Sequence, residues 1–207
     1  MVAVVLVSVV VAPMGHAPKY TNATEVQWTA TARAGTMAPA FARAAGMSYR
    51  EGRFWQPDVT VATVVVSGGR LLMVEETVRG RLVLNQPAGH LEPDESLVEA
   101  ALRETREETG WDVRLTAFVG AYQWRSPDTG DGEGRHYLRF AFAAEPVAHD
   151  PTRPLDDGIA RALWMTPGEL REAAPRHRSP LVWRAVHDHL SGRRHPLDLL
   201  SHLPAPR

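Results

Sequence analysis

Three glutamates at helical spacing are the residues of this sequence best suited to hold a cation. Glu107 and Glu108 lie three and four residues after Glu104, so on an α-helix all three project from one side. Like charges at this spacing repel by roughly a few tenths of a kcal/mol per pair, and a cation among them removes that cost. Together with backbone carbonyls near Gly89 they make an all-oxygen site that suits Mg²⁺, with Mn²⁺ as the alternative.

The same charges are also compatible with an ordinary solvated helix surface. Arg103 lies four residues from Glu99 and from Glu107, which gives two ion pairs of the kind common on exposed helices. Alternatively, Arg103 holds one carboxylate of a metal site in position through charge-assisted hydrogen bonds. Charge spacing alone leaves both interpretations open.

The helix that carries these glutamates has a start signal and a stop signal. Ser96 and Glu99 form an S-x-x-E capping box, which predicts a helix that begins near Leu97. Gly110 can adopt the left-handed conformation that ends it. One side of this helix is formed by Val98, Ala101, Leu102 and Thr105. We expect that side to pack on a sheet.

Strand patterns surround this helix. Residues 58–67 are rich in β-branched side chains, and Gly68-Gly69 predicts a hairpin to residues 70–76. Further strands are expected at residues 81–85, 113–126, 136–146 and 160–166, and helices at residues 167–174 and 179–192. Interleaved strands and helices with short loops predict an α/β fold with a mixed sheet and helices on its faces.

Composition excludes several classes of function. The chain has 207 residues, 44% of them hydrophobic, with a formal net charge of -1. No whole-chain field therefore attracts a nucleic acid polymer or an anionic membrane. Because the sequence has no cysteine, thiolate chemistry and Cys-based zinc sites are excluded. This composition fits a cytoplasmic protein.

Residues 1–46 differ from the rest of the chain. The apolar run at residues 2–12 is shorter than the roughly 20 residues that a membrane-spanning helix needs. No charge precedes Lys19, which disfavours a secretory signal. We expect a disordered leader, or a start codon placed upstream of a true first residue at Met47.

The stretch from Gly89 to Trp111 resembles the Nudix box, G-x5-E-x7-R-E-U-x-E-E-x-G-U, in which U is bulky and apolar. The fixed letters are all present, as Gly89, Glu95, Arg103, Glu104, Glu107, Glu108 and Gly110. Thr105 departs from the first U position, where we expect a cost in packing rather than in chemistry. Residues 54–200 resemble small bacterial Nudix phosphatases that act on hydroxymethylpyrimidine pyrophosphate and on nucleoside di- and triphosphates. The resemblance implies a Nudix α/β/α sandwich.

The resemblance also implies an enzyme that hydrolyses phosphoanhydrides with Mg²⁺ and releases orthophosphate. Glu104, Glu107 and Glu108 would hold the cation. The group that activates water stays open between Glu104, oriented by Arg103, a metal-bound hydroxide, and a residue outside the motif. Glu145 is the candidate from outside, as an extra ligand or base, although an exposed strand-end glutamate is an equal interpretation. Glu95 is expected to brace the loop.

Substrate contacts are expected from the flanking segments. Tyr122, Trp124 and Tyr137 could stack on a heteroaromatic ring, or could pack in the core or at its rim. Arg125 and Arg139 are candidates for contacts to terminal phosphates, although lone arginines on strands are usually solvated. His90 and Gln86 either contact phosphate or have a local structural role.

Two rival functions remain at this point. Nudix hydrolases of ADP-ribose often carry a proline about 16 residues beyond the box, and Pro127 has that spacing from Trp111. A Nudix domain that only binds nucleotide is the other rival, although such domains usually lose the acidic letters that this chain keeps. In each case the expected partner is a small molecule, and the oligomeric state stays open.

Overall fold

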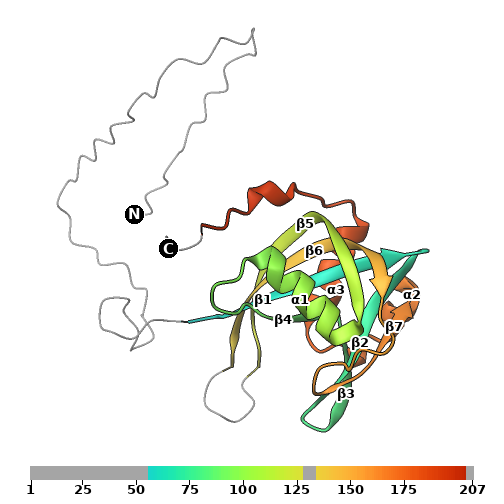
Figure 1. Ribbon diagram of the computed structural model, residues 1–207. Helices are drawn as coiled ribbons and strands as arrows, with labels where there is room; N and C mark the ends of the chain where they lie inside the picture. The colour runs from blue at the N-terminus through green and yellow to red at the C-terminus, as the bar shows by residue number, and fades with distance from the viewer. Residues whose placement is uncertain (1–55, 128–133, 204–207) are drawn as a thin grey trace, which may run out of the picture. The chain divides into compact units, whose positions relative to one another are not determined.

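The computed structural model describes residues 56–127 and 134–203, which belong to one compact unit (Figure 1). The expected leader at residues 1–46 lies outside the described residues. The strands are β1 (Asp58–Ser67), β2 (Arg70–Val78), β3 (Arg81–Asn85), β4 (Ala88–His90), β5 (Trp111–Arg125), β6 (His136–His149) and β7 (Ile159–Met165). The helices are α1 (Leu97–Thr109), α2 (Pro167–Glu172) and α3 (Pro180–Leu190), with short 3-10 helices η1 (Ala174–Arg176) and η2 (Leu197–Leu199).

The strands form a mixed sheet, as the sequence predicts. Its main path runs β3-β2-β1-β6-β5, with β4 paired to β1 and β7 paired to β2. The β1–β6 pair is parallel, whereas the pairs of β1 with β2 and of β5 with β6 are antiparallel. Because β4 pairs with β1 at Thr60 to Ala62, the chain enters the loop before α1 from the middle of the sheet.

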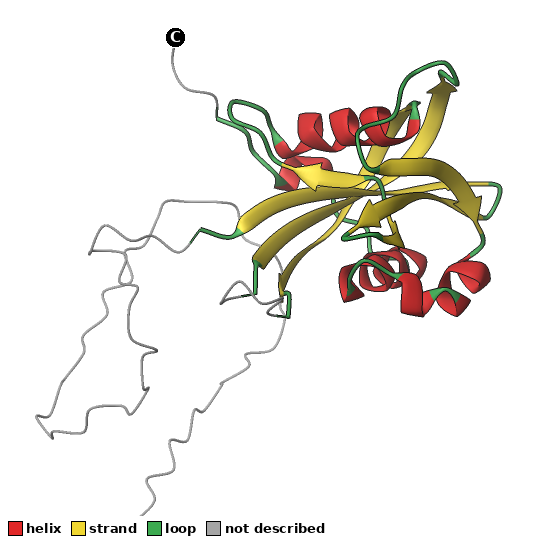
Figure 2. Ribbon diagram, turned by 90° about the horizontal axis from the view of Figure 1, so that it is seen from below, coloured by secondary structure: helices red, strands yellow, loops and turns green. Residues whose placement is uncertain are grey.

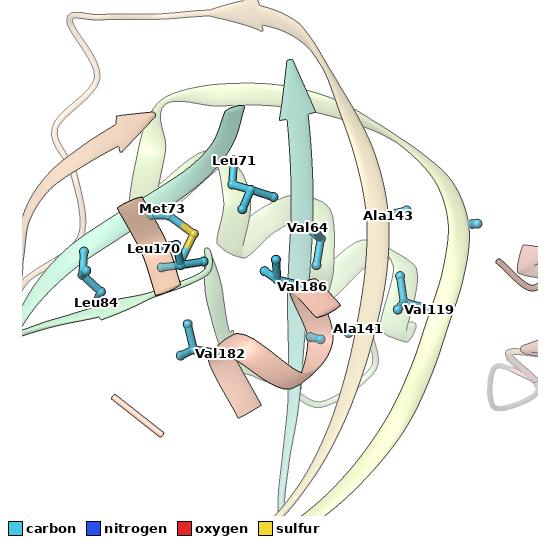
Figure 3. Packing of buried hydrophobic residues seen from close by; sticks show 12 residues of the cluster. Val64, Leu71, Met73, Leu84, Val119, Ala141, Ala143, Leu170, Val182 and Val186 are labelled. Atoms are coloured by element: carbon cyan, nitrogen blue, oxygen red, sulfur yellow. The ribbon is translucent and has the colours of Figure 1, made fainter. Parts of the chain in front are cut away.

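Helices cover both faces of this sheet (Figure 2). On one face, α1 packs over a cluster that includes Val61, Val65, Ala100, Phe118 and Phe142. On the other face, α2 and α3 pack over a cluster that includes Val64, Met73, Val119, Leu170, Val182 and Val186 (Figure 3). Alternate residues of β1 therefore point into opposite clusters, as expected for a strand that is buried on both faces.

The predicted ends of α1 are confirmed. The Ser96 hydroxyl accepts a hydrogen bond from the Glu99 N–H, and the Glu99 carboxylate accepts one from the Ser96 N–H, so the capping box is complete. Gly110 ends the helix with φ of 70°, and a β-carbon there would meet the Asp150 carbonyl at 2.7 Å. Glycine is therefore required at this end of the helix.

Thr105 lies against the sheet, fully buried. Its hydroxyl lies 2.7 Å from the Ala101 carbonyl oxygen and 2.8 Å from the Thr63 hydroxyl on β1. The departure from a bulky apolar residue is thus matched by a polar partner on the facing strand. This pairing satisfies a hydroxyl that burial would otherwise make costly.

No helix within the described ranges combines the length and the hydrophobicity that a membrane crossing requires.

Candidate functional site

Arg103 connects the loop before α1 to the acidic side of the helix. Its guanidinium donates to both oxygens of Glu95, at 2.7 and 3.0 Å, and to the His90 carbonyl at 3.0 Å. It also donates to Glu104 at 2.8 Å and to Glu107 at 3.1 Å. These bonds raise the pKa of Arg103, chiefly through Glu95. Only a planar group with several donors can serve so many acceptors.

Glu95 braces the loop, in agreement with the role expected for it. Besides its two bonds to Arg103, its carboxylate accepts a hydrogen bond from the Glu92 N–H at 2.7 Å. Hydrogen bonding to Arg103 lowers the pKa of Glu95, which keeps it charged. The loop is therefore tied to the helix by a permanent ion pair.

Glu108 is almost completely buried and lies under β4. Its carboxylate accepts a hydrogen bond from the Ala88 N–H at 2.8 Å, and its residue exposure is 8%. Burial raises the pKa of Glu108 to about 8, and the nearby Glu104 and Glu76 carboxylates add to the rise. A buried carboxylate with this pKa is a group whose charge calls for a cation.

Gly89 gives the Glu104 carboxylate room beside the backbone. A β-carbon at this position would lie 2.1 Å from the Glu104 carboxylate carbon and 2.2 and 2.3 Å from its oxygens. Burial also raises the pKa of Glu104, against the effect of the Arg103 hydrogen bond. Only glycine permits so close an approach of a carboxylate to the chain.

The carboxylate that joins the cluster from outside the helix is Asp156, which the sequence reasoning missed. Ligand atoms of Glu104, Glu107 and Asp156 all lie within 4.8 Å of one another. The Asp156 N–H donates to the Glu107 carbonyl at 3.2 Å, so the loop before β7 is bound to α1. Desolvation raises the pKa of Asp156, and the Glu107 carboxylate adds to the rise. No local pattern around Asp156 distinguishes it from other loop aspartates.

Glu145, the candidate from outside the motif, is placed elsewhere. Its side chain is 57% exposed on β6 and accepts a hydrogen bond from Arg114 at 2.5 Å. The two residues face each other across the β5–β6 pair. The structure therefore brings Asp156 to the acidic cluster, whereas Glu145 is paired with Arg114 on the surface.

A cavity of about 320 Å³ lies beside the acidic helix. One group of lining residues comes from β4, the loop after it and α1: Ala88, Gly89, His90, Glu92, Glu104 and Glu108. The other group comes from the sheet and from the segment before α3: Thr60, Glu76, Asn85, Tyr137, Arg139 and Arg178. The cavity therefore joins the carboxylates to a second, mixed polar wall.

Three of the candidates for substrate contact lie in this cavity wall. His90 lines it with an exposed ring, 4.0 Å from Asp58. Arg139 lines it as a buried side chain, 6% exposed, and is not the solvated strand arginine that such positions usually hold. Tyr137 also lines the cavity, and its ring stacks on Trp124 at 5.5 Å between centroids. Trp124 thus contacts the ring of Tyr137 but is not among the residues that line the cavity.

The other expected contacts are placed away from the cavity lining. Gln86 is fully buried and donates to the Val182 carbonyl at 2.7 Å, which ties it to α3. The Tyr122 hydroxyl donates to Asp188 on α3 at 3.1 Å, and burial raises the pKa of Tyr122. Arg125 is exposed at the end of β5. In this structure Gln86 and Tyr122 have structural roles that fasten α3 to the sheet.

The residues present fit a divalent cation. The donor set is made of hard carboxylate oxygens, which suits Mg²⁺. Any β-carbon at position 89 would fill the space that the Glu104 carboxylate occupies. Burial makes a negative charge on Glu108 unfavourable unless a cation compensates it. Glu104, Glu107 and Asp156 would hold the cation. Glu108 is not part of that group of ligand atoms and lines the neighbouring cavity together with Glu104.

Comparison with known proteins agrees with this geometry. Residues 55–183 match the sequence model of the NUDIX domain. Phosphatase NudJ of Escherichia coli K12 is 44% identical over 146 residues, which are 70% of this chain and 92% of that protein. A NUDIX hydrolase from Nitrosomonas europaea is 44% identical and has a TM-score of 0.68, covering 72% of this chain and 98% of that one.

A more distant structure shows the same fold. The MutT protein from Methanosarcina mazei Go1 has a TM-score of 0.52 at 18% identity, covering 69% of this chain and all of that one. The family model spans more than half of the 207 residues, and the box residues are intact around a helix with the expected caps. The chain therefore belongs to the Nudix hydrolase family.

Proposed function

We propose that this enzyme hydrolyses phosphoanhydride bonds of nucleoside di- and triphosphates and of hydroxymethylpyrimidine pyrophosphate, and releases orthophosphate. The observation that carries this proposal is the meeting of Glu104, Glu107 and Asp156 within 4.8 Å, beside a cavity that Glu104 and Glu108 line. Likeness to phosphatase NudJ over 146 residues supports the release of phosphate rather than another cleavage.

The chain's own residues prepare the site for an anionic substrate. Arg103 fixes the orientation of Glu104 and Glu107, so their oxygens need no rearrangement when a cation binds. Mg²⁺, when bound, supplies positive charge that offsets the charge of the phosphate oxygens. His90, exposed in the cavity wall, is positioned to donate a hydrogen bond to a phosphate oxygen.

The proposed reaction is attack of water on the terminal phosphorus. The water oxygen forms a bond to that phosphorus, and the bond from the phosphorus to the bridging oxygen breaks. Orthophosphate leaves, and the bridging oxygen stays with the remaining part of the substrate. We assign the Oε2 atom of Glu104 to accept the proton of the attacking water, since Arg103 binds its Oε1 atom.

Hydrolysis with Mg²⁺ tests the proposal, with orthophosphate measured directly and with AMP and pyrophosphate detected by chromatography, because cleavage of ADP-ribose releases no orthophosphate. The panel contains nucleoside diphosphates, nucleoside triphosphates, hydroxymethylpyrimidine pyrophosphate and ADP-ribose, each assayed with the wild type, Glu108→Gln and the exposed control Glu172→Gln. We expect Glu108→Gln to lower kcat/KM by on the order of 100-fold, with the control unchanged. Equal activity of wild type and Glu108→Gln would remove Glu108 from the site. Cleavage of ADP-ribose alone would overturn the substrate class, and no activity on the panel would favour a binding module.

A further inference from the structure

The part of the cavity wall that comes from the sheet contains a buried cation, Arg139, that forms no ion pair with another described residue. Arg139 is 6% exposed, and its guanidinium donates to the Thr60 hydroxyl and to the Asn85 side-chain oxygen, both at 3.4 Å. These bonds are long, and both acceptors are neutral. Among the described residues, no carboxylate pairs with Arg139. Burial lowers its pKa to about 10 and Arg178 adds to the effect, whereas the charges of Glu76 and Glu108 act in the opposite direction. A buried donor so weakly engaged is suited to an acceptor supplied by a ligand.

The same wall contains an acceptor without a donor. Glu76 is paired through Oε2 with Arg178, and its side chain is 13% exposed. Its other oxygen, Oε1, is buried and has no hydrogen-bond partner within the part of the chain that the structure describes. Both Glu76 and Arg178 line the cavity. A buried carboxylate oxygen of this kind is suited to an N–H group from a ligand.

An aromatic surface completes this wall. Tyr137 lines the cavity two residues before Arg139 on β6, so both side chains project from the same face of the strand. Trp124 stacks on Tyr137 with an angle of 20° between the rings, which holds the tyrosine in place. A flat ligand ring could therefore lie on Tyr137 with its edge toward polar groups.

These observations favour a ring over a second phosphate at this wall. A phosphate would gain from Arg139 and Arg178 but would be repelled by the Glu76 carboxylate, which lines the same cavity and is paired with Arg178. A ring that carries an amino group next to a ring nitrogen or carbonyl can donate to the Glu76 carboxylate and accept from the Arg139 guanidinium. We propose that Glu76 and Arg139 determine specificity by binding an amino-substituted pyrimidine ring, with Glu76 accepting from the amino group and Arg139 donating to the ring.

This inference rests on the proposed function, since it assigns the ring-binding part of the same site. Cytosine and uracil ligands make a matched test, because uracil carries a carbonyl where cytosine carries the amino group. Affinities for CMP and UMP are measured by calorimetry without catalysis, and kcat/KM for CTP and UTP is measured by phosphate release. We expect the wild type to prefer the cytosine ligand by about 10-fold or more in both measurements.

Two variants separate recognition from structure. Glu76→Gln removes the obligate acceptor, and we expect the preference to fall to within about threefold. Arg178→Gln breaks the same ion pair but keeps the Glu76 carboxylate, and we expect the preference to persist. Circular dichroism checks that each variant is folded. If Glu76→Gln does not fold, the wild-type comparison still decides.

Equal affinity of the wild type for CMP and UMP would overturn the inference. Loss of the preference in Arg178→Gln would also overturn it, because the ion pair and not the acceptor would then be responsible. A CMP preference without phosphate release from either nucleotide would support ring recognition and contradict the proposed function for nucleotides. The two failures are therefore distinguishable.

Discussion

A β-carbon on Gly89 would lie 2.1 Å from the carboxylate carbon of Glu104. This glycine, which comes before the helix in the sequence, is thus in direct contact with a carboxylate of the helix. The first fixed letter of the motif and one of its acidic letters are both explained by the same close approach.

Gly89→Ala should therefore impair cation binding more than folding. The added methyl group must displace the Glu104 carboxylate, which is the end of a flexible side chain, so the backbone can stay in place. We expect the Mg²⁺ concentration for half-maximal activity to rise by about 10-fold or more, with the Tm within a few degrees of the wild type. Mg²⁺ titration of activity together with thermal unfolding checks this. An unchanged Mg²⁺ requirement would show that Glu104 can move without loss.

Glu108 should make the stability of the metal-free protein fall as pH rises. Its pKa is about 8 in the folded protein and near its ordinary value of 4.5 when unfolded. A carboxyl group with a raised folded pKa favours the folded state below pH 4.5, and this contribution is lost as pH rises toward 8. In the wild type this effect lowers the free energy of unfolding by roughly 2 to 4 kcal/mol between pH 5 and pH 9, and we expect Glu108→Gln to abolish that decrease. Urea unfolding in EDTA between pH 5 and pH 9 measures it, and parallel curves for the two proteins would contradict it.

Asp156→Asn and Glu145→Gln test which carboxylate outside the helix serves the site. Asp156 lies with Glu104 and Glu107, whereas Glu145 is paired with Arg114 on the surface. We expect Asp156→Asn to lower kcat/KM by about 10-fold or more and Glu145→Gln to change it by less than about twofold. The same phosphate-release assay serves for both. The opposite order of effects would restore Glu145 as the outer ligand.

Arg103→Lys should keep a positive charge but lose most of the hydrogen bonds that Arg103 donates to the loop and to the acidic side of α1. A lysine ammonium has three donors on a flexible stem and cannot reproduce a planar group that contacts Glu95, Glu104, Glu107 and the His90 carbonyl together. We expect kcat/KM to fall by about 10- to 100-fold. Steady-state kinetics at saturating Mg²⁺ provides the measurement. Activity near that of the wild type would mean that charge alone is sufficient.

Thr63 and Thr105 should be energetically coupled. Thr105→Val leaves the buried Thr63 hydroxyl without its partner, which costs about 1 to 3 kcal/mol of unfolding free energy. The double change to valine removes both hydroxyl groups, and we expect it to be less destabilising than the sum of the single changes. Urea denaturation of the four proteins gives the coupling energy. Simple additivity would show that the two hydroxyl groups do not stabilise each other.

Local signals in the sequence were sufficient for the elements that carry the site. The capping box, the glycine at position 110 and the apolar side of the helix predicted α1 from Leu97 to its end, because these signals act within a few residues. The alternation and turn residues likewise predicted the main strands. Helical spacing also predicted that Glu104, Glu107 and Glu108 project from one side of α1.

The environment of those residues depended on contacts far apart in the sequence. Glu108 is buried against β4, where it accepts a hydrogen bond from Ala88. The loop before β7 folds back onto α1, so that Asp156 contacts Glu107. Arg139 is buried against Thr60 of β1 and Asn85 of β3. The sequence left Gln86 and Tyr122 open between a substrate contact and a structural role, and in the structure both form hydrogen bonds to α3. Helical periodicity predicts which residues share one side of a helix. Only the packing of segments that are distant in the sequence decides which of those side chains are removed from water. Removal from water shifts the pKa of a carboxylate and leaves a buried donor available for a ligand.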